Sequence, residues 1–265
     1  MAKRLAVVGC GSMGSAVVRG LLKVKWATPA QLVASHPRRA AALSKELGIQ
    51  VVASNPKAAK GAQVVLLGVK PQILPEVLKE IATSIAPGAL VLSMAAGVRT
   101  RTIEEALPGV PVVRSMPNLA ATVGMGATAI CAGAHALPEH LALARQVFEA
   151  VGVVEEVPER LMDAVTGLSG TGPMYVFNLV EAMADAGVKV GLGRDVAQRL
   201  ALQTLIGSAH LARDSHLHAA ALKDLVTSPG GTAIAALHIL RREGFQAIVM
   251  DAVEAATRRA AELGQ

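Results

Sequence analysis

Short runs of consecutive apolar residues alternate with amphipathic stretches over the first 157 residues. The apolar runs predict strands at residues 5–8, 32–34, 51–52, 64–67, 89–93, 110–114 and 127–131. Apolar residues at helical spacing predict helices at residues 15–24, 39–47 and 71–85. Because strands that are apolar on both faces need helices on both sides, the alternation predicts a parallel sheet in a doubly wound α/β domain.

The pattern changes near residue 157, beyond which no convincing strand follows. Helical spacing predicts helices at residues 161–168, 173–190, 195–211, 219–225, 233–242 and 247–263. Glycine-rich turns separate several of them. We therefore predict two domains: an α/β domain over residues 1–157 and an all-helical domain over residues 158–265.

The composition restricts the classes of ligand. Hydrophobic residues make up 52% of the chain and aromatic residues only 2%, so Ala, Val, Leu and Met must form the core. The net charge of +6 suits anionic ligands, but the basic residues are scattered and few aromatic rings are present to stack on bases. This predicts small anionic ligands and no binding of nucleic acid.

Several absences predict a cytoplasmic protein. Cys10 and Cys131 belong to no Cys-x-x-Cys motif, and the histidines lack the spacing of metal ligands, so we expect neither a disulfide framework nor a metal site. Met1–Arg4 do not begin a signal peptide of the usual form. The longest stretch without charge, residues 115–138, is interrupted by Pro and Gly and is not expected to span a membrane.

A glycine-rich turn follows the first predicted strand and opens the first predicted helix. Gly9, Gly11 and Gly14 form a Gly-x-Gly-x-x-Gly sequence. In this position the glycines permit a tight turn, close approach to a pyrophosphate, and close packing of helix on strand. The sequence therefore predicts a dinucleotide site in a Rossmann-type domain.

The end of the second predicted strand favours NADP over NAD. An NAD site usually carries an acid there, whereas this chain has Ser35, His36, Arg38 and Arg39. Arginines pair with phosphate in a forked geometry, which suits the 2′-phosphate of NADP. The alternative is that both arginines only face solvent. Lys70, at the carboxyl end of the fourth strand, is similarly either near the cofactor or a solvated surface lysine.

A second turn, Ser228-Pro229-Gly230-Gly231-Thr232, precedes a predicted helix. The free backbone N–H groups at a helix start bind anions such as a carboxylate. Two glycines there allow a ligand to approach the backbone closely. Taken alone, a turn of this kind is more often an ordinary helix start.

Taken together, these segments resemble the pyrroline-5-carboxylate reductase family over essentially the whole chain. The resemblance is carried by the glycine turn, by residues 68–71 and 95–98, by Gly-Leu-Ser-Gly-Thr-Gly-Pro at 167–173, by residues 181–188, and by the turn at 228–232. It implies NAD(P)H-dependent reduction of 1-pyrroline-5-carboxylate to L-proline. It further implies a helical dimerisation domain, an active site at the subunit interface, and dimers that can assemble into decamers.

The resemblance also assigns residues. Those expected to bind the cofactor are Gly9, Cys10, Gly11, Ser12, Met13, Ser35, His36, Arg38, Asn55, Val69, Lys70, Ala96 and Gly97. Those expected at the substrate are Glu159, Ser228, Gly230, Gly231, Thr232 and Ala233. Glu159 has an alternative interpretation as an acid in the first turn of a helix.

One position departs from the family. Similar proteins have Ser-Pro-Gly-Gly-x-Thr, and Ala233 stands where their threonine places a hydroxyl near the imine and carboxylate. The backbone N–H groups remain, so the anion site is expected to survive, with Thr232 or water replacing the hydroxyl. Ala233 therefore leaves a second interpretation open, in which the chain is a cofactor-binding protein with weakened turnover.

Two further oxidoreductase classes compete with this interpretation. A β-hydroxyacid dehydrogenase would carry a catalytic lysine in the helix that begins at Pro173, and residues 173–178 contain none. A broader cyclic imine reductase also lacks that lysine and stays an alternative. If the chain reduces 1-pyrroline-5-carboxylate, positioning and a charge-complementary pocket would supply most of the rate.

Overall fold

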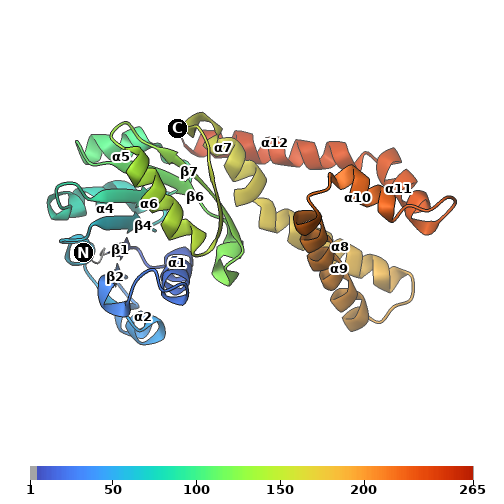
Figure 1. The fold of residues 1–265 in the computed structure, drawn as a ribbon, viewed down its shortest axis with the longest axis horizontal. Coiled ribbons are helices and arrows are strands. Elements are labelled where there is room, and N and C mark those ends of the chain that lie inside the picture. Colours follow the sequence, from blue (N-terminus) through green and yellow to red (C-terminus); the bar gives the residue numbers. More distant parts are fainter. Residues whose placement is uncertain (1–4, 265) are drawn as a thin grey trace. The chain divides into compact units, whose positions relative to one another are not determined.

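The computed structural model describes residues 5–264 and divides them into two units. The first unit runs to Thr171 and resumes at Glu254, and the second spans Gly172–Val253. Figure 1 traces the chain through both units. Met1–Arg4, from which the absence of a signal peptide was predicted, lie outside the described residues.

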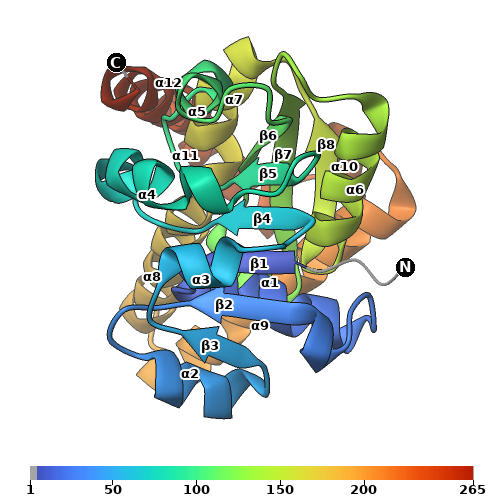
Figure 2. The same ribbon diagram turned by 90° about the vertical axis from the view of Figure 1, so that its left-hand side faces the viewer.

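The first unit is built on an eight-stranded sheet in the order β3-β2-β1-β4-β5-β6-β7-β8 (Figure 2). The strands are β1 (Leu5–Val8), β2 (Leu32–Ser35), β3 (Gln50–Val52), β4 (Val64–Leu67), β5 (Leu90–Ser93), β6 (Val112–Met116), β7 (Gly126–Ala132) and β8 (Gly152–Glu156). β1 to β6 are parallel, as predicted. The strand order reverses between β1 and β4, and such a reversal opens a ligand crevice at the carboxyl ends of the strands.

The prediction of a parallel sheet is wrong at β7, which runs antiparallel to β6. A parallel return needs a crossover of a dozen or more residues, usually through a helix. Residues 117–125 provide only a short connection with one 3₁₀ turn, η4 (Leu119–Val123), so the chain turns back beside β6. The last strand, β8, then pairs with β7 in parallel.

Helices cover both faces of the sheet because β1 sends alternate side chains to opposite sides. Leu5 and Val7 join the core under α1 (Ser12–Lys23), α2 (Ala40–Leu47) and α6 (Pro138–Glu149). Ala6 and Val8 join the core under α3 (Asn55–Ala59), α4 (Leu74–Ile81) and α5 (Thr100–Ala106). The sequence interpretation missed α3, α5, α6 and β8. Two of these helices begin near Pro56 and Pro138, a recognised signal of a helix start.

The chain passes from the first unit into the second through a π-helical turn. After the 3₁₀ turn η5 (Glu159–Leu161) and α7 (Met162–Val165), the π-helical turn η6 covers Thr166–Gly170. A Cβ on Gly170 would lie 2.6 Å from Met116 Cε, so this turn packs directly against the end of β6. Gly170 thus leaves room for the Met116 side chain.

The second unit is helical throughout its described residues. It contains α8 (Gly172–Lys189), α9 (Arg194–Ser215), α10 (Ala219–Leu225), α11 (Thr232–Arg242) and the first part of α12 (Phe245–Leu263). α8 and α9 approach closely through small residues, since a Cβ on Gly187 would lie 2.8 Å from Ala197 Cβ. Large apolar side chains stay exposed, including Phe177 and Ile248. Among the described helices, none is both long and apolar enough to span a membrane.

One buried polar atom predicts a stabilising substitution. Within the described residues, the Thr128 hydroxyl on β7 is buried without a hydrogen-bond partner. Because an unsatisfied buried hydroxyl is costly, we expect Thr128→Val to stabilise the protein by about 1 kcal/mol. Thermal unfolding should then shift upward by about 2–4 °C. Thr128→Ser, which keeps the hydroxyl and loses a methyl group, should lower the melting temperature. A Val variant that melts below the wild type would contradict this account.

Candidate functional site

The turn between β1 and α1 needs glycine for a different reason at each position. Gly9 has φ +85°, and a Cβ there would lie 2.3 Å from Val69 Cγ1. A Cβ on Gly14 would lie 2.9 Å from Val7 Cγ1, so this glycine brings α1 close to β1. Gly11, the residue before α1, has open space around its Cβ position. The open side of Gly11 is therefore where a ligand can approach the backbone.

Ser35 and Asn55, both predicted to bind the cofactor, hold this turn in place. The Gly9 N–H donates to Ser35 Oγ at 3.2 Å, and Ser35 Oγ donates to Asn55 Oδ1 at 2.7 Å. Asn55 Nδ2 in turn donates to Glu80 at 2.9 Å. Because Ser35 is fully buried, its hydroxyl orients the turn, and its predicted contact with a cofactor stays a prediction.

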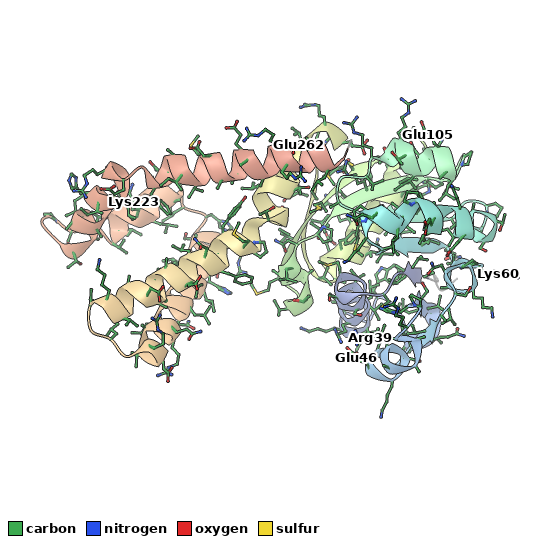
Figure 3. All side chains as sticks on the ribbon, turned by 180° about the vertical axis from the view of Figure 1, so that it is seen from behind. Arg39, Glu46, Lys60, Glu105, Lys223 and Glu262 are labelled. Atoms are coloured by element: carbon green, nitrogen blue, oxygen red, sulfur yellow. The ribbon has the colours of Figure 1, made fainter. Side chains whose placement is uncertain are left out.

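Two arginines follow β2, and among the described residues only one of their side chains has an ion pair. His36 Nδ1 accepts hydrogen bonds from the backbone N–H groups of Arg38 and Arg39 at 3.3 and 3.2 Å. Arg39 lies 3.7 Å from Glu46 on α2, and Figure 3 labels both side chains. The described part of the chain gives the exposed Arg38 no ion pair, so its guanidinium is available to an anion.

The other predicted cofactor residues lie at the same edge of the sheet. Val69 and Lys70 follow β4, while Ala96 and Gly97 follow β5. Lys70 and Ala96 are exposed, as are Ser12 and Gly11 at the start of α1, whereas Met13 is half-buried. The parallel strands bring these separate segments together at their carboxyl ends.

Cys10 is a structural residue of the glycine turn. Its side chain is buried, and Sγ lies 3.5 Å from Ser15 Oγ. Burial raises the pKa of the Cys10 thiol, which therefore stays protonated at neutral pH and is a poor nucleophile. The described residues contain no group of His, Cys, Asp and Glu side chains suited to a metal ion.

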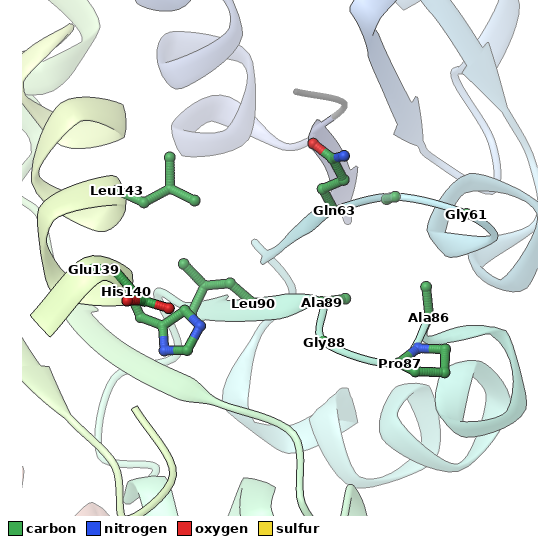
Figure 4. A pocket seen from close by; sticks show the side chains of 11 residues that line it. Gly61, Gln63, Ala86, Pro87, Gly88, Ala89, Leu90, Glu139, His140 and Leu143 are labelled. Atoms are coloured by element: carbon green, nitrogen blue, oxygen red, sulfur yellow. The ribbon is translucent and has the colours of Figure 1, made fainter. Parts of the chain in front are cut away.

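An open cavity of about 450 Å³ lies at the opposite edge of the sheet. Figure 4 shows residues that line it: Gln63 and Ala89, which precede β4 and β5, and Glu139 and His140 of α6. His140 Nδ1 accepts a hydrogen bond from the Leu137 N–H, so the ring helps to begin α6. Because this cavity borders the amino ends of the strands, it does not belong to the candidate cofactor site.

The Glu159 carboxylate is hydrogen-bonded to other residues of the first unit. Its carboxylate accepts hydrogen bonds from the Thr100 N–H at 2.7 Å and from Thr100 Oγ1 at 2.9 Å. Arg114 Nη1 lies 3.5 Å from the same carboxylate, and Nη2 lies 3.7 Å from Asp163. The Arg114 side chain is only 4% exposed. Sequence reasoning missed Arg114 and Thr100, although an arginine inside an apolar strand is itself a signal of a buried charge with partners.

The turn at 228–233 has the geometry of an anion site in the second unit. Gly230 has φ +68°, and Gly231 caps α11, where the structure describes no side-chain cap. The first N–H groups of α11 therefore stay available. A Cβ on Gly231 would lie 2.3 Å from Ser228 Oγ, which places this hydroxyl beside the helix start.

A cavity of about 500 Å³ borders the same turn. Gly230 and Gly231 line one end of it, and His238 and Arg241 of α11 line the remainder together with apolar side chains. Arg241 lies in the last turn of α11, so the cavity runs along the helix and carries a cationic side chain at the end away from the glycines. No described hydrogen bond joins Glu159 of the first unit to Thr232 or Ala233 of the second. The joint role of these three residues at a substrate therefore stays a prediction.

Comparison with known proteins matches both parts of the chain. Residues 159–263 match the family model for pyrroline-5-carboxylate reductase dimerisation. Residues 4–97 match the model described as NADP oxidoreductase, coenzyme F420-dependent. A pyrroline-5-carboxylate reductase of Synechocystis sp. is 45% identical over 267 residues, which cover 100% of both chains.

Solved structures agree over the same length. A pyrroline-5-carboxylate reductase of Coxiella burnetii superposes with a TM-score of 0.94 at 31% identity, covering 100% of both chains. A pyrroline carboxylate reductase of Plasmodium falciparum, solved with NADP bound, gives 0.89 at 30% identity and covers 99% of this chain and 98% of its own.

Two glycine substitutions should separate ligand binding from folding. Gly11→Ala fits the free protein, so we expect an almost unchanged melting temperature and NADPH binding weakened by about tenfold or more, because the methyl group occupies the pyrophosphate approach. Gly9→Ala combines a positive φ with a clash against Val69 and should lower the melting temperature itself. Fluorescence titration with NADPH and thermal unfolding measure the two effects. Unchanged NADPH affinity in the Gly11 variant would contradict this assignment.

Proposed function

The chain belongs to the pyrroline-5-carboxylate reductase family, and from this premise we propose how it reduces the C=N bond of 1-pyrroline-5-carboxylate to L-proline. The full-length match to reductases of this family carries the assignment. The reaction is the last step of proline biosynthesis and uses NAD(P)H.

NADPH is the proposed cofactor, and it supplies the hydride. The residues that would hold it surround the glycine turn, where Gly11 leaves space for a pyrophosphate and Arg38 has a free guanidinium for the 2′-phosphate. Val69, Lys70, Ala96 and Gly97 border the same edge. Ser35 and Asn55 contribute by fixing the Gly9 backbone.

The substrate carboxylate is proposed to bind at the start of α11. The N–H groups after Gly231 and the hydroxyls of Ser228 and Thr232 offer donors, and Arg241 adds positive charge along the bordering cavity. Holding the carboxylate orients the imine carbon, and this positioning accounts for much of the rate. A protonated imine already carries its proton, so hydride addition requires no further acid at nitrogen.

Glu159 is the proposed partner of the imine nitrogen. A carboxylate has about four lone-pair sites. Thr100 occupies two of them and Arg114 Nη1 a third, so Glu159 can accept one more N–H donor. Ala233 provides no hydroxyl at the position that carries one in similar proteins. Thr232 or an ordered water would then orient the substrate nitrogen.

The helical region is a dimerisation domain, and the chain accordingly forms a homodimer. Exposed apolar side chains such as Phe177 and Ile248 suit that role. We propose further that the dimers assemble into decamers, that the functional division between cofactor and substrate domains falls near residues 157–158, and that the protein acts in the cytoplasm.

NADPH preference should depend on Arg38. Replacing it with Ala removes the proposed phosphate partner, so KM for NADPH should rise by about tenfold while KM for NADH stays nearly unchanged. Arg39→Ala is the matched control, because Arg39 lies beside Glu46 and is expected to matter less. Initial rates with each cofactor measure the preference. Equal losses with NADPH and NADH would contradict a role at the 2′-phosphate.

The substrate site is tested by two imines and two glycine variants. Wild-type protein should oxidise NADPH with 1-pyrroline-5-carboxylate far faster than with a cyclic imine that lacks the carboxylate. Gly231→Val should raise KM for 1-pyrroline-5-carboxylate by about tenfold or more, because it crowds Ser228 and covers the helix start. Gly193→Val is the control, since Gly193 also caps a helix, α9, and has open space around it.

These assays also separate the alternatives. Turnover only with the imine that lacks a carboxylate would favour a broader cyclic imine reductase. NADPH binding without turnover on either imine would favour a cofactor-binding protein weakened by Ala233. An unchanged KM for 1-pyrroline-5-carboxylate in the Gly231 variant would contradict the proposal that the substrate carboxylate binds at the start of α11.

A further inference from the structure

The turn that follows β5, residues 94–97, is held by one local hydrogen bond and by contacts from two distant parts of the chain. The Met94 N–H donates to the Leu67 carbonyl at 3.0 Å, and the Ala95 N–H donates to Ser93 Oγ at 3.3 Å. Gly97 has φ +76°, and the end of α12 packs against it: a Cβ on Gly264 would lie 2.6 Å from the Gly97 carbonyl oxygen. The turn is thus held at its first two residues and at its last residue.

The exit of this turn is fixed by Glu159. Thr100 lies three residues after Gly97 and begins α5. Both of its donors, the N–H and the hydroxyl, point to the Glu159 carboxylate at 2.7 and 2.9 Å. Thr100 itself is buried, and the buried Arg114 faces the same carboxylate at 3.5 Å. Glu159 is therefore a charged, partly buried residue whose described partners all belong to the first unit.

We propose that Thr100 and Glu159 are positioning residues for the cofactor: together they set the conformation of the turn at 94–97. The inference rests on the proposed function, which places the cofactor at Ala96 and Gly97. It adds a second role for Glu159, because the carboxylate expected to contact the imine also anchors a cofactor-binding turn. The Glu159 side chain then orients the substrate directly and the cofactor through the turn at 94–97.

The two roles of Glu159 differ in what they do to NADPH binding when no imine is present. A residue that only contacts the imine changes KM for the imine and leaves the Kd for NADPH unchanged. A positioning residue changes the Kd for NADPH in the absence of substrate. Equilibrium fluorescence titration of the full-length protein with NADPH therefore distinguishes them.

The variants follow from the hydrogen bonds. Thr100→Val keeps the side-chain shape and removes one donor, so the Kd for NADPH should rise by about fivefold, the equivalent of one hydrogen bond. Glu159→Ala removes both bonds and should raise it by about tenfold or more. Because the two substitutions remove the same contact, a double variant with Thr100→Val and Glu159→Ala should bind NADPH no more weakly than Glu159→Ala alone. Thr100→Ser keeps the hydroxyl and should bind within about twofold of the wild type.

The matched control is Thr102→Val, on the same helix and exposed. It should leave the Kd for NADPH unchanged, and thermal unfolding should show that every variant compared is folded. If Thr100→Val fails to fold, Glu159→Gln, which keeps one acceptor, takes its place and should raise the Kd less than Glu159→Ala. Wild-type protein that binds no NADPH would overturn the proposed function. Wild-type binding with all Thr100 and Glu159 variants within about twofold would overturn this inference alone.

Discussion

The backbone contact between the β1–α1 turn and the end of β4 is the constraint on which the cofactor edge depends. A Cβ on Gly68 would lie 2.7 Å from the Gly9 carbonyl oxygen, and a Cβ on Gly9 would strike Val69. Two chain segments can approach this closely only where both lack side chains. Their contact fixes where α1 begins, and so leaves the open side of Gly11 facing the carboxyl ends of the strands.

In both units, the polar groups of the candidate sites divide into those that already have hydrogen-bond partners within the protein and those that can bind a ligand. Ser35, Asn55 and Glu159 already have partners inside the first unit. The exposed Arg38 and the uncapped start of α11 have the capacity to bind anions. A site of this kind performs chemistry by holding two ligands in a fixed geometry, and few of its side chains need unusual protonation states.

The second unit relies on small side chains in place of a large core. Gly187 and Ala197 bring α8 and α9 together, and few of its large apolar residues are buried within one chain. Such a bundle has exposed apolar area that a dimer covers. This arrangement fits the low aromatic content, because alanine-rich helices approach each other at short distances.

The sequence by itself determined the strands of the first unit through β6, its helices α1, α2 and α4, the helical second half, and the glycine turn, because these follow from local periodicity and from the conformations that only glycine adopts. It could not determine that β7 runs antiparallel, since strand direction depends on how residues 117–125 return through space. Nor could it find the bonds from Thr100 and Arg114 to Glu159. Those contacts join residues 45 or more positions apart, and only the tertiary structure brings such residues together.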